Sequence, residues 1–172
     1  YNLSIPKPED VIGHKIGDRH TRTSQVVNYF ESIANVSDRV VLDDHARSHE
    51  GRRLIHVIVT HPENHKNLDN LRLENVKISD MPGQMKNKNL DKMPLVAYLG
   101  FSIHGDEASG TEAAVLLRHH LAAGQGDEID QILRNTILII DPMFNPDGRD
   151  RFANWANGNR GVVPTTDTQN RE

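Results

Sequence analysis

The stretch from Leu95 to Gly110 constrains the fold of this chain more than any other. Its apolar run leads to His104, and an acidic residue, Glu107, follows three positions later. A long alanine- and leucine-rich segment begins directly after it. This order predicts a buried strand, a tight turn and a helix that leaves the turn. Residues three apart at a helix start can face the same way, and Gly105 relaxes the backbone between them.

His104 and Glu107 are therefore candidate metal ligands. The chain has no cysteine, so any bound metal must rest on His, Asp or Glu. Imidazole and carboxylate without thiolate suit a catalytic zinc that keeps a position open for water. The alternative is an ordinary histidine and a glutamate that only complements the dipole of the helix N-terminus.

A catalytic zinc usually has three protein ligands, and this chain shows no third one. His119 and His120 belong to the helix that starts at the turn. They lie roughly 18–20 Å along it, too far to bind a metal held by His104 and Glu107. His56 and His61 belong to the hairpin region, and the remaining histidines show no ligand spacing: His14, His20, His45, His49 and His65. We expect them to be surface or core residues.

Composition limits the class of protein. A chain of 172 residues with 36% hydrophobic and 26% charged residues can form one domain with a real core. The formal net charge of −4 shows no excess of basic residues of the kind that nucleic-acid-binding domains have, so we expect no nucleic-acid partner. No apolar run approaches the ~20 residues of a membrane helix, so we expect no membrane partner either. The absence of cysteine suits the cytosol and the periplasm equally.

The hydrophobic pattern predicts an α/β fold with a mixed parallel and antiparallel sheet flanked by helices. Residues 1–20 are expected to form an extended arm, 21–172 the main domain, and 64–93 a helix followed by a polar surface excursion. The strand expected over Val96–Ile103 is apolar enough to be covered on both faces. Three further helices and a hairpin complete the pattern: a helix from an N-cap at Thr23 to near Val36, a hairpin of Val40–Leu42 with Arg53–Thr60, and helices over Ala108–Ala123 and Glu128–Arg134. A second buried strand is expected over Thr136–Ile140, with loops after Asp141.

A second polar cluster follows that strand, at the sheet edge where ligands gather in α/β folds. The residues of Asn145-Pro-Asp-Gly148 are those that favour β-turns, so a plain β-turn explains this stretch as well as a functional role does. Arg160, Asn170 and Arg171 stand farther on. A planar guanidinium can bind a carboxylate through two hydrogen bonds, although any single one of these arginines could equally be a solvated surface residue.

Taken together, these residues resemble the zinc carboxypeptidase (M14-type metallocarboxypeptidase) family from about Thr21 to the end of the chain. The resemblance rests on the order of five features: the first helix, Glu50-Gly51-Arg52 at the hairpin turn, His104-Gly-Asp-Glu107, Asn145-Pro-Asp-Gly148 and Asn170-Arg171. It implies a zinc-carboxypeptidase-like central sheet and one zinc ion held by His104 and Glu107. It also implies that an Asp orients the zinc-binding His. Asp167 matches that position with one extra residue between it and the Asn-Arg pair.

The resemblance also assigns the substrate side. Asn170 and Arg171 would grip the terminal carboxylate of a peptide. A separate arginine would polarise the scissile carbonyl and stabilise the oxyanion; its best match is Arg160, with Arg151 as the second choice. Glu172 stands where many members have Asn.

In that family a third zinc ligand, His, and a general-base Glu both come later than residue 172. We therefore expect this chain to be the N-terminal part of a catalytic domain, processed or trimmed at both ends, and inactive as a peptidase by itself. The implied activity of the whole is zinc-dependent hydrolysis of C-terminal peptide bonds by metal-activated water. The resemblance favours a secreted or periplasmic location and leaves the oligomeric state open.

Three alternatives remain at this point. Deacylases of the aspartoacylase and succinylglutamate-desuccinylase kind also use a His-Gly-x-Glu turn and an Asn-Arg pair, and a cell-wall peptide amidase would fit too. A non-catalytic binding module that kept the fold is the alternative from another class, because fold does not fix function.

Overall fold

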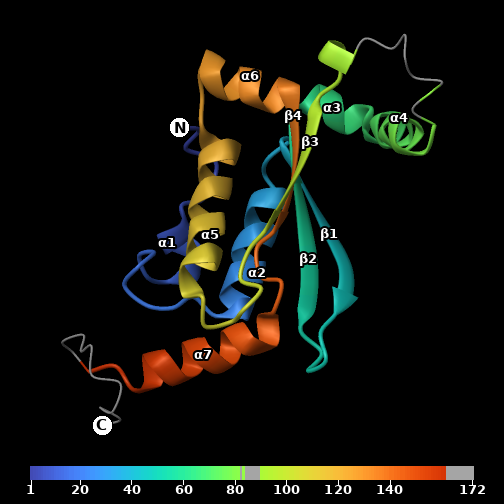
Figure 1. Ribbon diagram of the computed structural model, residues 1–172. Helices are drawn as coiled ribbons and strands as arrows, with labels where there is room; N and C mark the ends of the chain where they lie inside the picture. Colours follow the sequence, from blue (N-terminus) through green and yellow to red (C-terminus); the bar gives the residue numbers. More distant parts are fainter. Residues whose placement is uncertain (82, 84–89, 162–172) are drawn as a thin grey trace.

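The computed structural model describes residues 1–81, 83 and 90–161. In this part of the chain, a mixed four-stranded sheet has the strand order β1-β2-β4-β3. β1 pairs with β2 and β2 with β4 in antiparallel fashion, whereas β3 and β4 run parallel. The strands are β1 (Val40–Arg47), β2 (Arg53–Val59), β3 (Leu95–Gly100) and β4 (Thr136–Asp141). The predicted α/β class with a mixed sheet is confirmed (Figure 1).

Helices flank the sheet: α2 and α5 cover one of its faces, and α1 packs against these two helices (Figure 1). Among the described residues, none of the helices has both the length and the apolar character needed to cross a membrane. The helical segments are α1 (Pro8–Ile12), α2 (Thr23–Ala34), α3 (Pro62–Lys66), α4 (Leu68–Asp80), the short 3₁₀ segment η2 (Leu90–Lys92), α5 (Ala108–Ala123), α6 (Asp127–Asn135) and α7 (Pro146–Gly158).

The core lies between this helical layer and the sheet. On β2, Ile55, Val57 and Val59 are buried while the residues between them are only partly covered, which is the period-two pattern of a strand with one core face. Helix α2 buries a stripe at helical spacing against them: Val26, Val27, Tyr29, Phe30 and Ile33. The expected helix and hairpin are thus confirmed.

The start of α2 differs from the prediction by one residue. Thr23 is the first helical residue and not the N-cap, which is Arg22. The Thr23 hydroxyl donates to the Pro146 carbonyl (3.1 Å), and its backbone N–H donates to Asp150 (2.8 Å). The threonine therefore ties α2 to α7, a contact that local sequence cannot reveal.

The prediction that the strand before His104 is covered on both faces is wrong for the structure described. In the described part of the chain, β3 is an outer strand that pairs only with β4, and Leu95, Val96 and Tyr98 are 67%, 40% and 51% exposed. The central position belongs to β4, where Ile137 and Ile140 are buried. An apolar run indicates a strand, but strand order decides how much of it is covered.

The loops expected after Asp141 include a helix, α7. The Asn145 side chain accepts a hydrogen bond from the Gly148 N–H (2.9 Å), Pro146 occupies the first helical turn and Asp147 lies beside it. These are strong helix-start signals. The polar, Asn- and Gly-rich composition of the segment concealed them, and the plain β-turn interpretation is wrong.

The first twenty residues are not an extended arm throughout. Pro8 begins α1, and Gly13 ends it in the left-handed conformation (φ 87°) that glycine tolerates best. Ile5 and Ile12 join the core. The segment expected as a helix and polar excursion contains α3 and α4, neither of which has a buried residue. The rest of that excursion lies largely outside the described residues.

Candidate metal and substrate site

The segments that follow β3 and β4 lie side by side at the carboxyl ends of these parallel strands. Backbone hydrogen bonds continue beyond the strands: the Phe101 N–H donates to Asp141 (2.9 Å), Phe144 to Phe101 (2.8 Å) and Asn145 to Ser102 (3.0 Å). This ladder brings the His104 turn next to the start of α7. The two polar clusters identified in the sequence therefore meet at one sheet edge, as expected for α/β sheets.

The turn itself is held by short-range hydrogen bonds. The Glu107 N–H donates to the His104 carbonyl (3.2 Å), and the Ser102 hydroxyl donates to the same oxygen (3.2 Å). Ser102 is buried and has a positive φ of 54°, which is uncommon for a residue other than glycine. Strain of this kind gathers at functional sites. His104 and Glu107 are both exposed, so their donor atoms are accessible to an ion.

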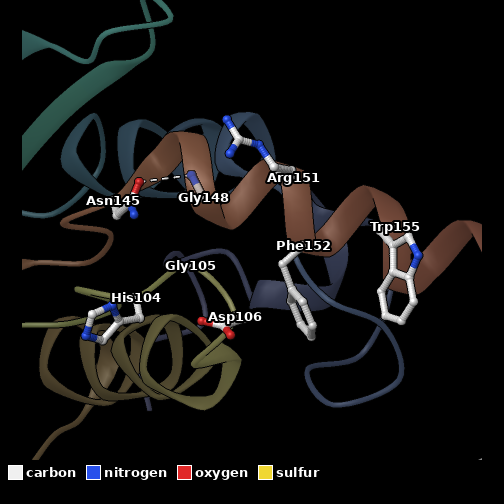
Figure 2. A pocket seen from close by; sticks show the side chains of 8 residues that line it. All are labelled: His104, Gly105, Asp106, Asn145, Gly148, Arg151, Phe152 and Trp155. Carbon is white, nitrogen blue, oxygen red and sulfur yellow. Dashed lines mark hydrogen bonds between the residues drawn. The ribbon is translucent and has the colours of Figure 1, made fainter. Parts of the chain in front are cut away.

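A pocket of about 460 Å³ lies between this turn and one side of α7. Figure 2 shows Phe152 and Trp155 projecting from α7 toward the side on which His104 and Asp106 lie. The aromatic rings supply an apolar wall opposite a polar turn, a combination typical of ligand sites. The lining residues are His104, Gly105, Asp106, Asn145, Gly148, Arg151, Phe152 and Trp155.

Arg151 is the pocket's arginine, whereas Arg160 lies beyond the C-terminal end of α7 and does not line it. The Arg151 guanidinium points away from His104 in Figure 2 and forms an ion pair with Glu50 of the hairpin loop (3.0 Å). Hydrogen bonds from Arg52 and then from Arg151 lower the pKa of Glu50, so this carboxylate stays ionised. The second-choice arginine is thus nearer the His104 turn than the first choice.

Arg149 of α7 is fully buried behind the site and braces it. It donates to the Thr21 carbonyl (3.0 Å) and to the Ala108 carbonyl (2.9 Å), and pairs with Glu112 of α5. Desolvation lowers the pKa of Arg149, and the Glu112 carboxylate opposes that shift. Because Ala108 directly follows Glu107, this arginine anchors the end of the candidate metal turn.

A second brace comes from the hairpin loop between β1 and β2. Arg52 pairs with Asp147 (2.8 Å) and Asp150 (2.7 Å) at the start of α7. The Ser48 hydroxyl also donates to Asp147 (2.6 Å). The loop that contains Glu50-Gly51-Arg52 therefore positions α7, and with it the pocket wall.

The residues present fit a zinc ion in chemistry but supply only part of its ligand set. His104 and Glu107 are a nitrogen and an oxygen donor in one exposed turn, as zinc requires. In the described ranges, neither belongs to a group of three potential ligands. Asp167, Asn170 and Arg171 lie outside the described residues, so their roles stay predictions.

Sequence inspection missed two kinds of site residue. Arg149 and Glu112 are distant in sequence, and nothing in their local pattern marks them as partners. The other group is His45, His56 and Asp141, whose potential ligand atoms all lie within 4.8 Å of one another. Its members come from three strands, so no spacing along the chain could have revealed it.

Comparison with known proteins bears on the family and on the fold. The family model for zinc carboxypeptidases matches residues 26–171. The search of curated proteins found no match.

Two solved structures share the fold at low sequence identity. Thrombin activatable fibrinolysis inhibitor superimposes with a TM-score of 0.57 at 14% identity, over 83% of this chain and 33% of that one. Carboxypeptidase A from Helicoverpa armigera gives a TM-score of 0.56 at 16% identity, over 92% of this chain and 41% of that one. The chain therefore spans less than half of the length of each of these two structures. On the strength of the family match, the chain belongs to the zinc carboxypeptidase family.

Proposed function

We propose that this chain contributes the first two zinc ligands and part of the substrate pocket to a metallocarboxypeptidase that removes C-terminal residues from peptides. The observation that carries the proposal is the exposed His104–Glu107 turn, held against α7 over a pocket with an aromatic wall. The family match supports the same reaction class. Because the chain spans only part of its structural relatives, the activity belongs to the whole protein and not to these residues alone.

His104 and Glu107 would hold the zinc ion. When bound, zinc polarises a carbonyl and makes its bound water a nucleophile near neutral pH. Arg149 and Gly105 have no chemical role in this scheme. They hold the turn against α7, so that both donors keep one orientation.

The substrate side is assigned by resemblance and by the pocket. Asn170 and Arg171 would bind the terminal carboxylate, and Asp167 would orient the zinc-binding histidine. For the oxyanion we retain Arg160 as the family match, with Arg151 as the arginine that lines the pocket. Phe152 and Trp155 offer an apolar surface for a substrate side chain.

The test is hydrolysis by the full-length protein of matched peptides with free and amidated C-termini, together with N-acyl amino acids. We expect cleavage of the free-acid peptide only. His104→Ala and Glu107→Gln should each reduce bound zinc below one equivalent and lower kcat/KM at least 100-fold, roughly the loss of a few kcal/mol of transition-state stabilisation. His49→Ala, an exposed histidine of the hairpin loop, is the matched control.

Equal cleavage of the amidated peptide would refute recognition of a terminal carboxylate. Hydrolysis of N-acyl amino acids alone would identify a deacylase. Stoichiometric zinc without any hydrolysis would favour a binding module.

A further inference from the structure

A cluster of potential ligands lies on the sheet face opposite the helical core layer. His45 of β1, His56 of β2 and Asp141 of β4 each present a donor atom, and these atoms lie within 4.8 Å of one another. His56 Nε2 is 3.8 Å from Asp141 Oδ2. The two imidazole rings are stacked, with centroids 3.9 Å apart. None of the three residues lines the His104 pocket.

Strand alternation explains why the three side chains share this face. On β2, Ile55 and Val57 point into the core, so His56 between them points the other way. On β4, Ile140 is in the core, so the next residue, Asp141, lies on the opposite face. The pairing of β1 with β2 shifts register between Asp44 and Ala46, which makes His45 the extra residue of a β-bulge. Bulges re-aim side chains and are common next to functional sites.

Asp141 is the feature that makes this more than a surface histidine pair. It is only 3% exposed. Its Oδ1 accepts from the Met143 N–H (3.1 Å), and its Oδ2 accepts from the Tyr98 hydroxyl (3.4 Å). The Tyr98 ring also lies edge-on to His56. Buried carboxylates are usually paired with a cation or bound to a metal, and among the described residues Asp141 has no Lys or Arg ion-pair partner.

The geometry points to a second metal site: we propose that His45, His56 and Asp141 bind one divalent transition-metal ion of the zinc class. Two imidazoles and one carboxylate are a donor set for zinc and its first-row neighbours, whereas Mg²⁺ and Ca²⁺ prefer oxygen alone. Donors about 2 Å from a tetrahedral ion lie roughly 3.3 Å apart. His56 Nε2 and Asp141 Oδ2, 3.8 Å apart, are already close to this separation, and the exposed His45 can rotate its ring toward an ion between them.

The ion would join three of the four strands of the sheet. Its ligands come from β1, β2 and β4, and Tyr98 of β3 holds the carboxylate in place. Orienting partners of this kind are typical of metal ligands. The proposal does not depend on peptidase activity, because no ligand is shared with the His104 turn.

The test measures zinc binding to the full-length protein with the first site removed by His104→Ala and Glu107→Gln. After chelation, calorimetric titration with Zn²⁺ should still show a binding event in this background. Adding His45→Ala and His56→Ala should weaken it at least tenfold. Adding His49→Ala instead should leave it unchanged, because this exposed histidine of the same hairpin lies outside the cluster.

A second measurement protects the test against a folding defect in the variants. With His45 and His56 intact, Zn²⁺ should shift the ring resonances of both histidines in NMR spectra, and excess Mg²⁺ should not reverse the shift. The proposal fails if zinc does not bind in the His104→Ala, Glu107→Gln background, if affinity survives the loss of both cluster histidines, or if neither ring responds to zinc. Competition by Mg²⁺ at equal concentration would overturn the assignment to the zinc class.

Discussion

The backbones of Gly105 and Gly148 are in direct contact across the candidate site. A Cβ atom on Gly105 would lie 1.9 Å from the carbonyl carbon of Gly148 and 2.2 Å from the Arg149 nitrogen. No side chain can enter this space, so the candidate metal turn rests on the first turn of α7 without an intervening atom. The position of His104 is thus coupled to that of the helix that forms the pocket wall.

Replacement of Gly105 by alanine should therefore separate the turn from α7. Since the clash is with backbone and not with a flexible side chain, we expect Gly105→Ala to lower the free energy of unfolding by about 3 kcal/mol. Zinc affinity at His104 and Glu107 should fall with it. Gly158→Ala at the end of α7 is the control, because a Cβ there meets nothing within 4 Å. Denaturant unfolding of both variants checks this, and equal stabilities would show that the contact is dispensable.

The buried pair of Arg149 and Glu112 should be sensitive to loss of one partner. In Glu112→Gln the guanidinium remains fully buried without its counter-charge, so we expect destabilisation of about 3 kcal/mol. Glu112 also accepts from the Thr21 N–H and hydroxyl at 2.8 and 2.7 Å, so the first residues of the domain should loosen as well. Hydrogen exchange around Thr21 measures that loosening.

Glu63→Gln is the matched control for this charge removal, since Glu63 pairs with Lys66 at the exposed surface. Exposed pairs of this kind contribute little to stability. If both substitutions had the same small effect, Arg149 would not depend on Glu112.

Arg118 is a buried cation with few partners. It donates to the Phe30 carbonyl (2.6 Å) and stacks over the Phe30 ring, but its Nε and one terminal nitrogen have no partner among the described residues. Desolvation lowers its pKa to about 9. Methionine of similar length should relieve this cost, so we expect Arg118→Met to raise the free energy of unfolding by about 1 kcal/mol.

Arg118→Lys is the informative counterpart, because it keeps a buried charge and loses the planar stack over Phe30. We expect it to be less stable than the wild type. A loss of stability in Arg118→Met as large as that in Arg118→Lys would show that the Phe30 contacts outweigh the desolvation cost.

Two partly buried histidines should make stability depend on pH between about 5 and 7. Burial lowers the pKa of His20, with a further contribution from Arg149, and burial likewise lowers the pKa of His119, both from 6.5. Below pH 6.5 the unfolded chain therefore binds more protons at these two histidines than the folded chain does. The contribution of the two neutral histidines to the free energy of unfolding is fully present above pH 6.5. It is lost as the pH falls from 6.5 through the lowered pKa values of the folded state.

The variant with His20→Gln and His119→Gln should show a smaller fall in unfolding free energy from pH 7 to pH 5 than the wild type. Carboxyl groups with a lowered pKa, such as Glu50, titrate below about pH 4.5 and do not contribute to the change in unfolding free energy between pH 5 and pH 7. His49→Gln serves as the exposed control. An unchanged slope in the double variant would assign the pH dependence to other groups.

Local sequence predicted the elements whose pattern is strong over a short range. The helix expected over Ala108–Ala123 has those bounds in the structure, and the alternating residues of β2 have the expected core face. His104 and Glu107 could be predicted as a ligand pair because both lie in one turn, only three residues apart. In each case the physical cause, a periodicity or a ligand spacing, is contained in a few consecutive residues.

Other features followed only from how the elements pack. The exposure of β3 depends on the strand order. The polar composition of α7 does not predict a helix, which is stabilised by its Asn145 N-cap and by the ion pair of Arg52 with Asp147. Likewise, only the position of α7 shows that Arg151 lines the pocket and Arg160 does not.

The sequence by itself therefore determined the fold class and the family resemblance, and it predicts His104 and Glu107 as zinc ligands because they lie in one turn. Only the tertiary structure decided what surrounds them: the glycine contact with α7, the buried brace of Arg149 and Glu112, and the cluster of His45, His56 and Asp141. The reason is physical. Pairing of strands and packing of helices bring together residues that are more than a hundred positions apart, and neither periodicity nor spacing along the chain records such contacts.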